Sequence, residues 1–338
     1  MNTAKTEPHL NLRDASAAIA VRVETAMRDD LKTSLADCDP LLSEVVHYTL
    51  FNGGKRVRPL LTVLCSRCCG RDDDDLYLLA TAFEYLHVAT LVHDDVIDRA
   101  AQRRGKETVA ARYGLASAIL VGDWLHARSM HLIGKLAGPE GLEIFCRATA
   151  SMVNGEFEQL RHIGNIETKE HDYFRVIRQK TGNLIASTCA IGALFAGADS
   201  RHQQALATYG NNIGAAFQVV DDLLDFQGDA QTTGKQTGND FVEGKITLPL
   251  LHALERASEE ERQTIDTLIR GDRTQPEAYQ HLVAFIGRHE GFTSAARTAQ
   301  QHIALAIDAL APFSKPGNED INVTLLKELA DYIIARKK

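Results

Sequence analysis

Apolar residues recur at spacings of three and four positions along most of this chain. Two representative series are Leu41, Leu42, Val45, Val46 and Leu50, and Leu76, Leu79, Ala80, Phe83 and Leu86. Side chains with this spacing lie on one face of an α-helix, whereas a half-buried strand would show strict alternation of apolar and polar residues. No stretch alternates convincingly in that way. The pattern therefore predicts an all-α fold.

Glycine, proline and asparagine cluster between the helical stretches and divide the chain into about a dozen predicted helices. The breaks lie at residues 52–54, 70–75, 138–139, 164–165, 228–238 and 315–318. The four successive aspartates at 72–75 are predicted to form a solvated loop. No long linker separates two halves of the chain. We therefore expect one all-α domain over residues 14–338, preceded by a flexible N-terminus at 1–13.

Composition supports long helices and narrows the class of protein. Only eight of the 338 residues are proline, which favours uninterrupted helices because proline lacks a backbone donor. The chain has 37 Lys and Arg residues against 45 Asp and Glu residues, a net charge of -8. A general nucleic-acid-binding protein would carry a basic surface, so we expect no nucleic-acid partner.

The cysteines and the N-terminus favour a cytoplasmic protein. Six cysteines in a chain of this length do not form a secreted disulfide framework. Cys65, Cys68 and Cys69 share an apolar stretch without a nearby histidine, so we interpret them as packing residues rather than zinc ligands. Residues 1–13 lack the apolar core of a signal peptide, and no run of about 18 apolar residues predicts a transmembrane helix.

One acidic pattern, DDxxD among aliphatic residues, occurs twice, in the runs LVHDDVID and QVVDDLLD. Asp94 and Asp98 are four residues apart and share one helical face, as do Asp221 and Asp225. We call these pairs the first claw and the second claw. Acidic pairs usually lie on solvated helix faces, but the flanking Val, Ile and Leu residues place these carboxylates at the edge of the core. Ionised groups there need a counter-charge, which a bound cation supplies.

The claws predict a magnesium ion together with a phosphate-bearing substrate. Oxygen ligands favour Mg²⁺ or Ca²⁺ over zinc, and Mg²⁺ typically combines one or two carboxylates with substrate phosphates. Basic residues that can hold such a substrate lie at 53–59 (GGKRVRP), 103–106 (RRGK), 180–182 (KTG), Lys235 and Lys245. Each alone is more often a surface charge. Together with two claws they indicate a diphosphate site.

A histidine accompanies the first claw. His87 lies seven residues before Asp94, and therefore on the same helical face two turns away. On geometry alone, a packing role and a functional role are equally good interpretations. In its functional role the imidazole would donate a hydrogen bond to a second anionic group.

Taken in order, these motifs resemble the trans-isoprenyl diphosphate synthase (polyprenyl synthetase) family over about residues 40–336. The matching segments are GGKRVRP at 53–59, HVATLVHDDVID at 87–98, RRG at 103–105, KTG at 180–182, FQVVDDLLD at 217–225, GKQTGND at 234–240 and GKITLP at 244–249. The resemblance implies an isoprenoid-synthase-type helical bundle around a central cavity, with the two claws facing each other across its mouth. It also implies a Mg²⁺-dependent head-to-tail condensation of isopentenyl diphosphate with an allylic diphosphate. The expected enzyme is a cytoplasmic homodimer that contacts membranes only transiently, to release its product.

Carried over position by position, the resemblance assigns roles to three groups of residues. Asp94, Asp98 and Asp221 are expected to ligand Mg²⁺, with Asp95, Asp222 and Asp225 in supporting or water-mediated roles. The allylic diphosphate is expected to contact Arg103, Lys180 and Lys235, with Thr181, Gln218 and Lys245 lining the same side. Isopentenyl diphosphate is expected to contact Lys55, Arg58, His87 and Arg104. The six aspartates, Lys180 and Lys235 form the expected catalytic set.

Two small residues, Ala89 and Thr90, occupy the fifth and fourth positions before Asp94. In the family that the chain resembles, an aromatic residue at either position blocks the product tunnel and gives short products. The small residues therefore imply a long-chain product, with octaprenyl favoured. Leu86 and Phe83 are the next residues along the helix that can close the tunnel. The alternative is a short-chain enzyme that makes geranylgeranyl or farnesyl diphosphate.

Three other classes of protein explain less of the sequence. His87 and the His93-Asp94 pair suggest an HD-type metal phosphohydrolase, but that class leaves the second claw and GGKRVRP unexplained. A non-catalytic subunit of a heteromeric synthase would have lost aspartates from one claw, and both claws are complete. A terpene cyclase would need no isopentenyl diphosphate site, so Lys55 and Arg58 count against it.

Overall fold

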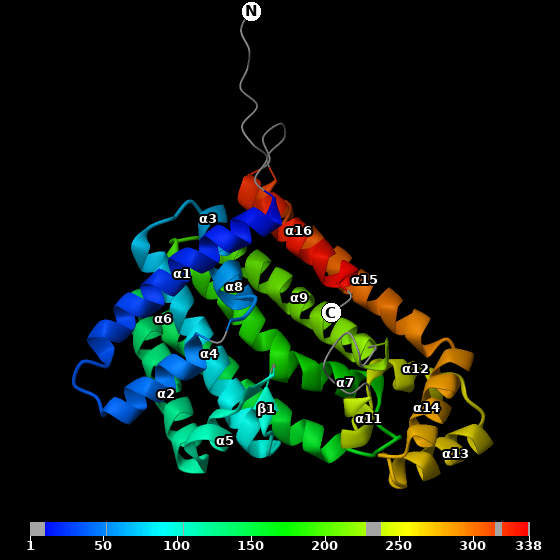
Figure 1. Ribbon diagram of the computed structural model, residues 1–338. Coiled ribbons are helices and arrows are strands. Elements are labelled where there is room, and N and C mark those ends of the chain that lie inside the picture. Colours follow the sequence, from blue (N-terminus) through cyan, green and yellow to red (C-terminus); the bar gives the residue numbers. More distant parts are fainter. Residues whose placement is uncertain (1–10, 52, 104, 228–237, 315–319, 337–338) are drawn as a thin grey trace, which may run out of the picture. The chain divides into compact units, whose positions relative to one another are not determined.

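The computed structural model describes residues 11–51, 53–103, 105–227, 238–314 and 320–336. These residues are almost entirely helical, which confirms the predicted all-α class (Figure 1). The chain divides into two compact units. The first unit comprises Met1–Leu142, Ala190–Gln203 and Pro312–Leu329, and the second comprises Glu143–Cys189, Gln204–Ala311 and Ala330–Lys338. The single domain over residues 14–338 stays a prediction.

The first unit is built around one apolar helix. Its elements are α1 (Leu12–Ser34), α2 (Pro40–Leu50), α3 (Val57–Cys68), α4 (Asp74–Ile97), β1 (Gln102–Arg103), β2 (Lys106–Glu107), α5 (Val109–Tyr113) and the first part of α6 (Leu115–His162). Helix α4 packs against both α1 and α3 (Figure 1). Its side chains from Leu76 to Leu86 are almost all buried, so α4 forms the centre of this core.

Helix α4 is, among the described residues, the one helix long and apolar enough to cross a membrane. In its most apolar window, however, 72% of the residues are buried inside the protein. A core helix of a folded domain has this burial, because its apolar side chains face other helices.

The aspartate run at 72–75 does not form the predicted loop throughout. Asp73 is the N-cap of α4 and its carboxylate accepts from the backbone N–H of Leu76 at 3.0 Å, while Asp74 and Asp75 lie in the first helical turn. A side-chain acceptor satisfies a backbone donor there, and acidic residues favour the positive end of the helix dipole. Consecutive aspartates thus start this helix.

The break predicted at 138–139 and the predicted absence of strands have different outcomes. The break at 138–139 is confirmed, because Gly138 has φ 68° and ψ -168° and interrupts the 48-residue α6 just before Pro139. No strand was predicted, but β1 and β2 form an antiparallel pair around the RRG segment, with Gly105 at φ 75°. Strands of two residues are too short to show alternation, so the pattern could not reveal them.

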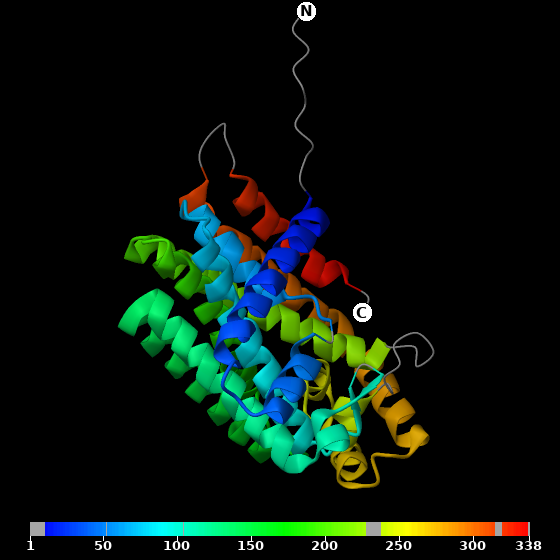
Figure 2. The same cartoon turned by 60° about the vertical axis from the view of Figure 1, so that its left-hand side comes forward.

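The second unit surrounds α12 (Leu248–Arg256), most of whose side chains are buried and which packs against three other helices. Those helices are α7 (Glu170–Ile177), α14 (Pro276–Arg288) and α15 (Gly291–Ala309). Figure 2 shows the chain from a second side, with the helices after α12 in yellow to red. The unit also contains η1 (Arg178–Gly182), α11 (Asn239–Glu243), α13 (Glu259–Arg270) and most of α9 (Ser200–Gln227). The chain passes between the units within α6, α8 (Asn183–Phe195), α9, η2 (Ala311–Phe313) and α16 (Ile321–Ala335).

Candidate active site

The first claw lies at the C-terminal end of α4. The backbone N–H of Asp98 donates to the carbonyl of Asp94 at 2.8 Å, so the two aspartates are one helical turn apart, as their spacing predicts. The side chain of Asp94 is half-buried and that of Asp98 is exposed. Carboxylates here lie beside the negative end of the helix dipole, where a cation is favoured.

Two backbone hydrogen bonds fix the end of α4 immediately after the claw. Arg99 has a left-handed φ of 52°, and its N–H donates to the carbonyl of Val96 at 3.3 Å. The N–H of Ala100 donates to the carbonyl of Asp95 at 2.9 Å. This pattern is a Schellman motif, which turns the chain sharply towards β1.

Arg103 is held next to the first claw by Asp95. The guanidinium Nε of Arg103 lies 2.6 Å from Oδ1 of Asp95, whose side chain is buried. Thr108 closes the hairpin behind it, since its hydroxyl donates to the carbonyl of Ala100 at 2.8 Å. Asp95 therefore orients Arg103, and its supporting role at the metal site stays a prediction. Arg104 lies outside the described residues.

Arg58 lies on α3, and His87 lies on α4 together with Glu84. These two helices of the first unit pack against each other. Arg56 is buried, has φ 48° and forms an ion pair with Glu84, so it holds the start of α3 against α4. Burial lowers the pKa of the Arg58 guanidinium, and the charge of Glu84 opposes this effect. The Nε of Arg58 is buried without a hydrogen-bond partner. An unsatisfied guanidinium donor suits an anionic ligand, while Lys55 is exposed at the same end of α3.

The second claw lies on α9, in the second unit, and Asp222, next to it in sequence, accepts two side-chain hydrogen bonds. The Tyr173 hydroxyl donates to Oδ2 of Asp222 at 2.6 Å, and Nε2 of Gln218 donates to Oδ1 at 2.9 Å. Burial, together with the charge of Asp240, raises the pKa of Asp222 to about 8. Asp222 therefore connects α9 with Tyr173 of α7, and its supporting role at the metal site stays a prediction.

Asp240 and Lys245 complete this acidic group. The backbone N–H of Asp240 donates to Oδ2 of Asp225 at 3.1 Å, and Nζ of Lys245 lies 3.0 Å from Oδ1 of Asp240. Burial and the charge of Asp240 raise the pKa of Asp225 to about 6. Burial alone would lower the pKa of Lys245, but the charges of Asp240 and Glu243 raise it. The Nζ of Lys245 thus pairs with two carboxylates, since it also lies 2.6 Å from Oε2 of Glu243.

The donor chemistry of both claws fits Mg²⁺. Every side-chain donor in them is a carboxylate oxygen, the ligand type that Mg²⁺ prefers. Within the described part of the chain, no three His, Cys, Asp or Glu side chains lie close enough to hold a metal ion by themselves. That arrangement suits an ion whose other ligands come from a diphosphate. The two claws belong to different units, so their facing each other stays a prediction.

Lys180 and Thr181 lie on η1, a π-helical turn between α7 and α8. The Nζ of Lys180 is 2.8 Å from Oε1 of Glu156, and the Thr181 hydroxyl donates to Oε1 of Gln218 at 3.3 Å. Two glycines allow neighbouring helices to approach this turn: a Cβ on Gly155 would lie 2.8 Å from the backbone N of Lys180, and one on Gly214 would lie 2.8 Å from the Cα of Gly182. The wider turn directs Lys180 and Thr181 towards α6 and α9. Such π-turns are rare and occur mostly at functional sites.

A pocket of about 210 Å³ brings four of the expected residues of the second unit together. Lys180, Gln218, Asp222 and Lys245 line it, and the other polar side chains of its lining had not been predicted: Gln159, His162, Thr168, Tyr173, Asp240 and Thr247. Asp240 lies inside the matched segment GKQTGND and was the easiest of these to find. Lys235, from the same segment, lies outside the described residues.

Thr247 has an unusual environment for a helix N-cap. It precedes α12 without a side-chain capping bond, and its Oγ1 is buried without a hydrogen-bond partner. The Thr247 hydroxyl, which lines the pocket, can therefore donate a hydrogen bond to a ligand there.

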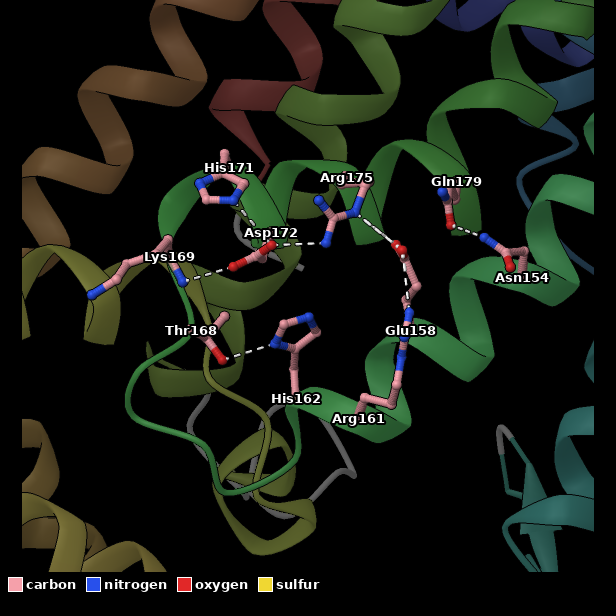
Figure 3. Close-up of polar contacts among 10 residues, drawn as sticks. All are labelled: Asn154, Glu158, Arg161, His162, Thr168, Lys169, His171, Asp172, Arg175 and Gln179. Atoms are coloured by element: carbon pink, nitrogen blue, oxygen red, sulfur yellow. Dashed lines mark hydrogen bonds and ion pairs between the residues drawn. The ribbon is translucent and has the colours of Figure 1, made fainter.

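Ion pairs beside the pocket connect the end of α6 with α7 (Figure 3). Arg175 lies between Asp172 and Glu158, with its Nε 3.1 Å from each carboxylate oxygen of Glu158. His162, which lines the pocket, contacts the hydroxyl of Thr168 through Nδ1 at 3.0 Å. These contacts fix the wall that carries Tyr173.

Comparisons with known proteins identify the family of this chain. The family model described as polyprenyl synthetase matches residues 39–286. Octaprenyl diphosphate synthase of Haemophilus influenzae is 36% identical over 271 residues, which cover 80% of this chain and 82% of that protein. Nonaprenyl diphosphate synthase of Mycobacterium tuberculosis is 33% identical over 330 residues, covering 97% and 96%. The crystal structure of a decaprenyl diphosphate synthase from Rhodobacter capsulatus matches with a TM-score of 0.87 and 35% identity, covering 98% of this chain and all of that one.

The family match covers more than half of the chain, and the relatives are similar over most of their own length. The order of the basic segments and the two claws along the chain agrees with that result. This chain belongs to the polyprenyl synthetase family and is a prenyltransferase of the all-α isoprenoid synthase fold.

Proposed function

We propose that the chain condenses isopentenyl diphosphate head-to-tail with an allylic diphosphate, with Mg²⁺, to give a long-chain all-trans polyprenyl diphosphate. Octaprenyl diphosphate is the favoured product. The observation that carries the proposal is the pocket in which Lys180, Gln218, Asp222 and Lys245 meet beside the second claw. Support for the product comes from the similarity to the octaprenyl diphosphate synthase of Haemophilus influenzae.

The reaction requires stabilisation of a leaving diphosphate rather than a protein nucleophile. Mg²⁺, when bound, would supply positive charge to the departing group, and Asp94, Asp98 and Asp221 are its proposed ligands. Lys180, Lys245 and Arg103 would add fixed positive charge where negative charge develops. Lys235 and Arg104 are further proposed contacts. The buried apolar side chains of α4 would keep water away from the carbocation.

The proposed function is tested by product analysis. Purified protein is incubated with isopentenyl diphosphate, Mg²⁺ and each allylic primer in turn, and the products are separated by chromatography. We expect condensation with release of diphosphate and a product near eight isoprene units. Release of phosphate from nucleotides, with no condensation, would instead support the phosphohydrolase alternative.

The two diphosphates should depend on different cationic residues. We expect Lys55→Ala, Arg58→Ala and His87→Ala to raise the KM for isopentenyl diphosphate by about 10- to 100-fold, because each removes a charge-assisted hydrogen bond. Lys180→Ala should instead raise the KM for the allylic substrate. Steady-state kinetics with each substrate varied in turn measures both effects.

A matched control for these variants is Lys135→Ala. Lys135 is an exposed lysine of α6 without a proposed role in the site, so both KM values should stay within about twofold of the wild-type values. Equal effects of all four site variants on both substrates would contradict the proposed division.

A second copy of the chain is the proposed partner. Val153, Phe157 and Leu160 are exposed by 52%, 66% and 61%, and their spacing places them on one face of α6. Such a contiguous apolar face marks a protein interface. We expect a dimer at micromolar concentration in sedimentation experiments, and dissociation of the dimer when Phe157→Glu and Leu160→Glu are combined.

Val21 provides the control for the interface variants. It is 67% exposed on α1, so Val21→Glu should leave the dimer intact. A wild-type monomer would contradict the proposed homodimer. A cytoplasmic location, with transient membrane contact for product release, completes the proposal.

A further inference from the structure

The residue that follows α16 contacts the second claw. One terminal nitrogen of Arg336, Nη2, lies 2.6 Å from Oδ1 of Asp221 and donates to the carbonyl of Phe217 at 2.8 Å. The guanidinium carbon also lies 3.9 Å from the centre of the Phe217 ring. The Arg336 side chain is only 6% exposed. Arg336 thus connects the C-terminal end of the described chain with α9.

This contact involves an oxygen of a proposed magnesium ligand. Asp221 is followed on α9 by Asp222 and Asp225, so Arg336 supplies positive charge to a strongly acidic segment. The Asp221 side chain is 43% exposed, and a cation from solvent can therefore reach it. An ion bound to Oδ1 at the usual Mg²⁺–oxygen distance would lie within about 5 Å of the guanidinium nitrogen. Two cations this close repel each other.

We propose that Arg336 is a positioning residue that holds Asp221 in the metal-free enzyme and is displaced from it by the divalent cation. The proposal rests on the proposed function, because it takes Asp221 as a ligand of Mg²⁺. Arg336 keeps the carboxylate oriented before the metal arrives. Binding of the metal to Asp221 and release of Arg336 from Asp221 are then coupled in one equilibrium.

Incomplete hydrogen bonding makes this exchange feasible. The Nε of Arg336 is buried without a partner, so the guanidinium does not have the full set of hydrogen bonds that would make it costly to move. Arg128 provides a contrast in the first unit. Two of its nitrogens donate to the carboxylate of Asp30, which also accepts from the Tyr85 hydroxyl at 3.0 Å.

Binding of Mn²⁺ without substrate tests the proposal independently of catalysis. The dissociation constant is measured by electron paramagnetic resonance, with Mn²⁺ alone and with Mn²⁺ plus inorganic diphosphate. We expect Arg336→Gln to bind Mn²⁺ about 3- to 10-fold more tightly than the wild type, because the competing cation is gone. Arg336→Lys keeps the charge and should stay within about twofold of the wild type. In an Asp221→Asn background, Arg336→Gln should no longer change the Mn²⁺ affinity.

Thermal unfolding provides a second readout. Without metal, Arg336→Gln should lower the unfolding temperature, and saturating Mn²⁺ should raise it by more than in the wild type, since tighter binding stabilises more. Arg128→Gln is the matched control: it removes a buried arginine–aspartate pair far along the sequence from the second claw, so it should lower stability without changing the Mn²⁺ affinity.

Equal or weaker Mn²⁺ binding by Arg336→Gln would overturn the proposal. Failure of the wild-type enzyme to condense isopentenyl diphosphate with any allylic primer would overturn the proposed function instead. The Mn²⁺ titration decides the role of Arg336 in either case, because it uses no substrate turnover.

Discussion

Replacement of Asp94 or Asp221 by alanine is expected to lower turnover by at least about a thousandfold, which corresponds to about 4 kcal/mol of lost transition-state stabilisation. Each variant removes a proposed Mg²⁺ ligand, because alanine has no side-chain oxygen to bind the ion. Asp94 lies at the negative end of α4, and Asp221 lies in the acidic segment of α9. Initial rates with saturating isopentenyl diphosphate, allylic primer and Mg²⁺ measure the effect.

The same initial rates are measured in excess chelator and for a control variant. Excess chelator should abolish wild-type turnover, and added Mg²⁺ should restore it. Asp29→Ala is the control, because Asp29 is an exposed aspartate of α1 that pairs with Lys32 at 2.7 Å and has no proposed role. Its turnover should stay within about twofold of the wild type. Near-normal turnover in chelator, or in either claw variant, would contradict the proposed metal dependence.

Local sequence patterns predicted the helices and the position of the first claw well. The spacing of Leu76, Leu79 and Phe83 reflects the buried surface of α4, and the four-residue spacing of Asp94 and Asp98 corresponds to the observed helical turn. Both predictions depend on residues close in sequence, for which helical periodicity is a direct physical constraint. The aspartate run at 72–75 failed as a loop because a helix N-terminus and a solvated loop favour the same residue type.

Contacts between distant residues could not be predicted in the same way. Tyr173 and Asp222 are 49 residues apart, and Arg336 and Asp221 are 115 apart. Neither pair carries a local pattern, because the hydrogen bonds form only after α7, α9 and the C-terminus have packed. The π-turn at Lys180 likewise depends on Gly155 and Gly214 of other helices. For this reason the sequence predicted a role for Lys180 without revealing how the backbone directs its side chain.

Ala89→Phe is expected to shift the product from about eight isoprene units to three or fewer, with catalysis retained. Ala89 is 2% exposed on α4 and lies five residues before Asp94, about 7.5 Å along the helix axis. That distance is comparable with the first isoprene units of a chain growing from the diphosphate. A phenyl ring there would meet the tail before Leu86 or Phe83 could, both of which are buried further along α4.

The measurement compares product lengths by chromatography, at equal turnover, for the wild type and two variants. Thr90→Phe is the second variant, because Thr90 is only half-buried and tolerates a larger side chain with less strain. Overpacking at Ala89 costs about 1–3 kcal/mol, so unfolding temperatures are recorded for each protein. Ala299→Phe is the control: Ala299 is 1% exposed on α15, and an aromatic residue there should lower stability without changing product length. If folded, active Ala89→Phe and Thr90→Phe enzymes both kept the wild-type products, these positions would not line the path of the growing chain, and the product length would have to be set elsewhere in the fold.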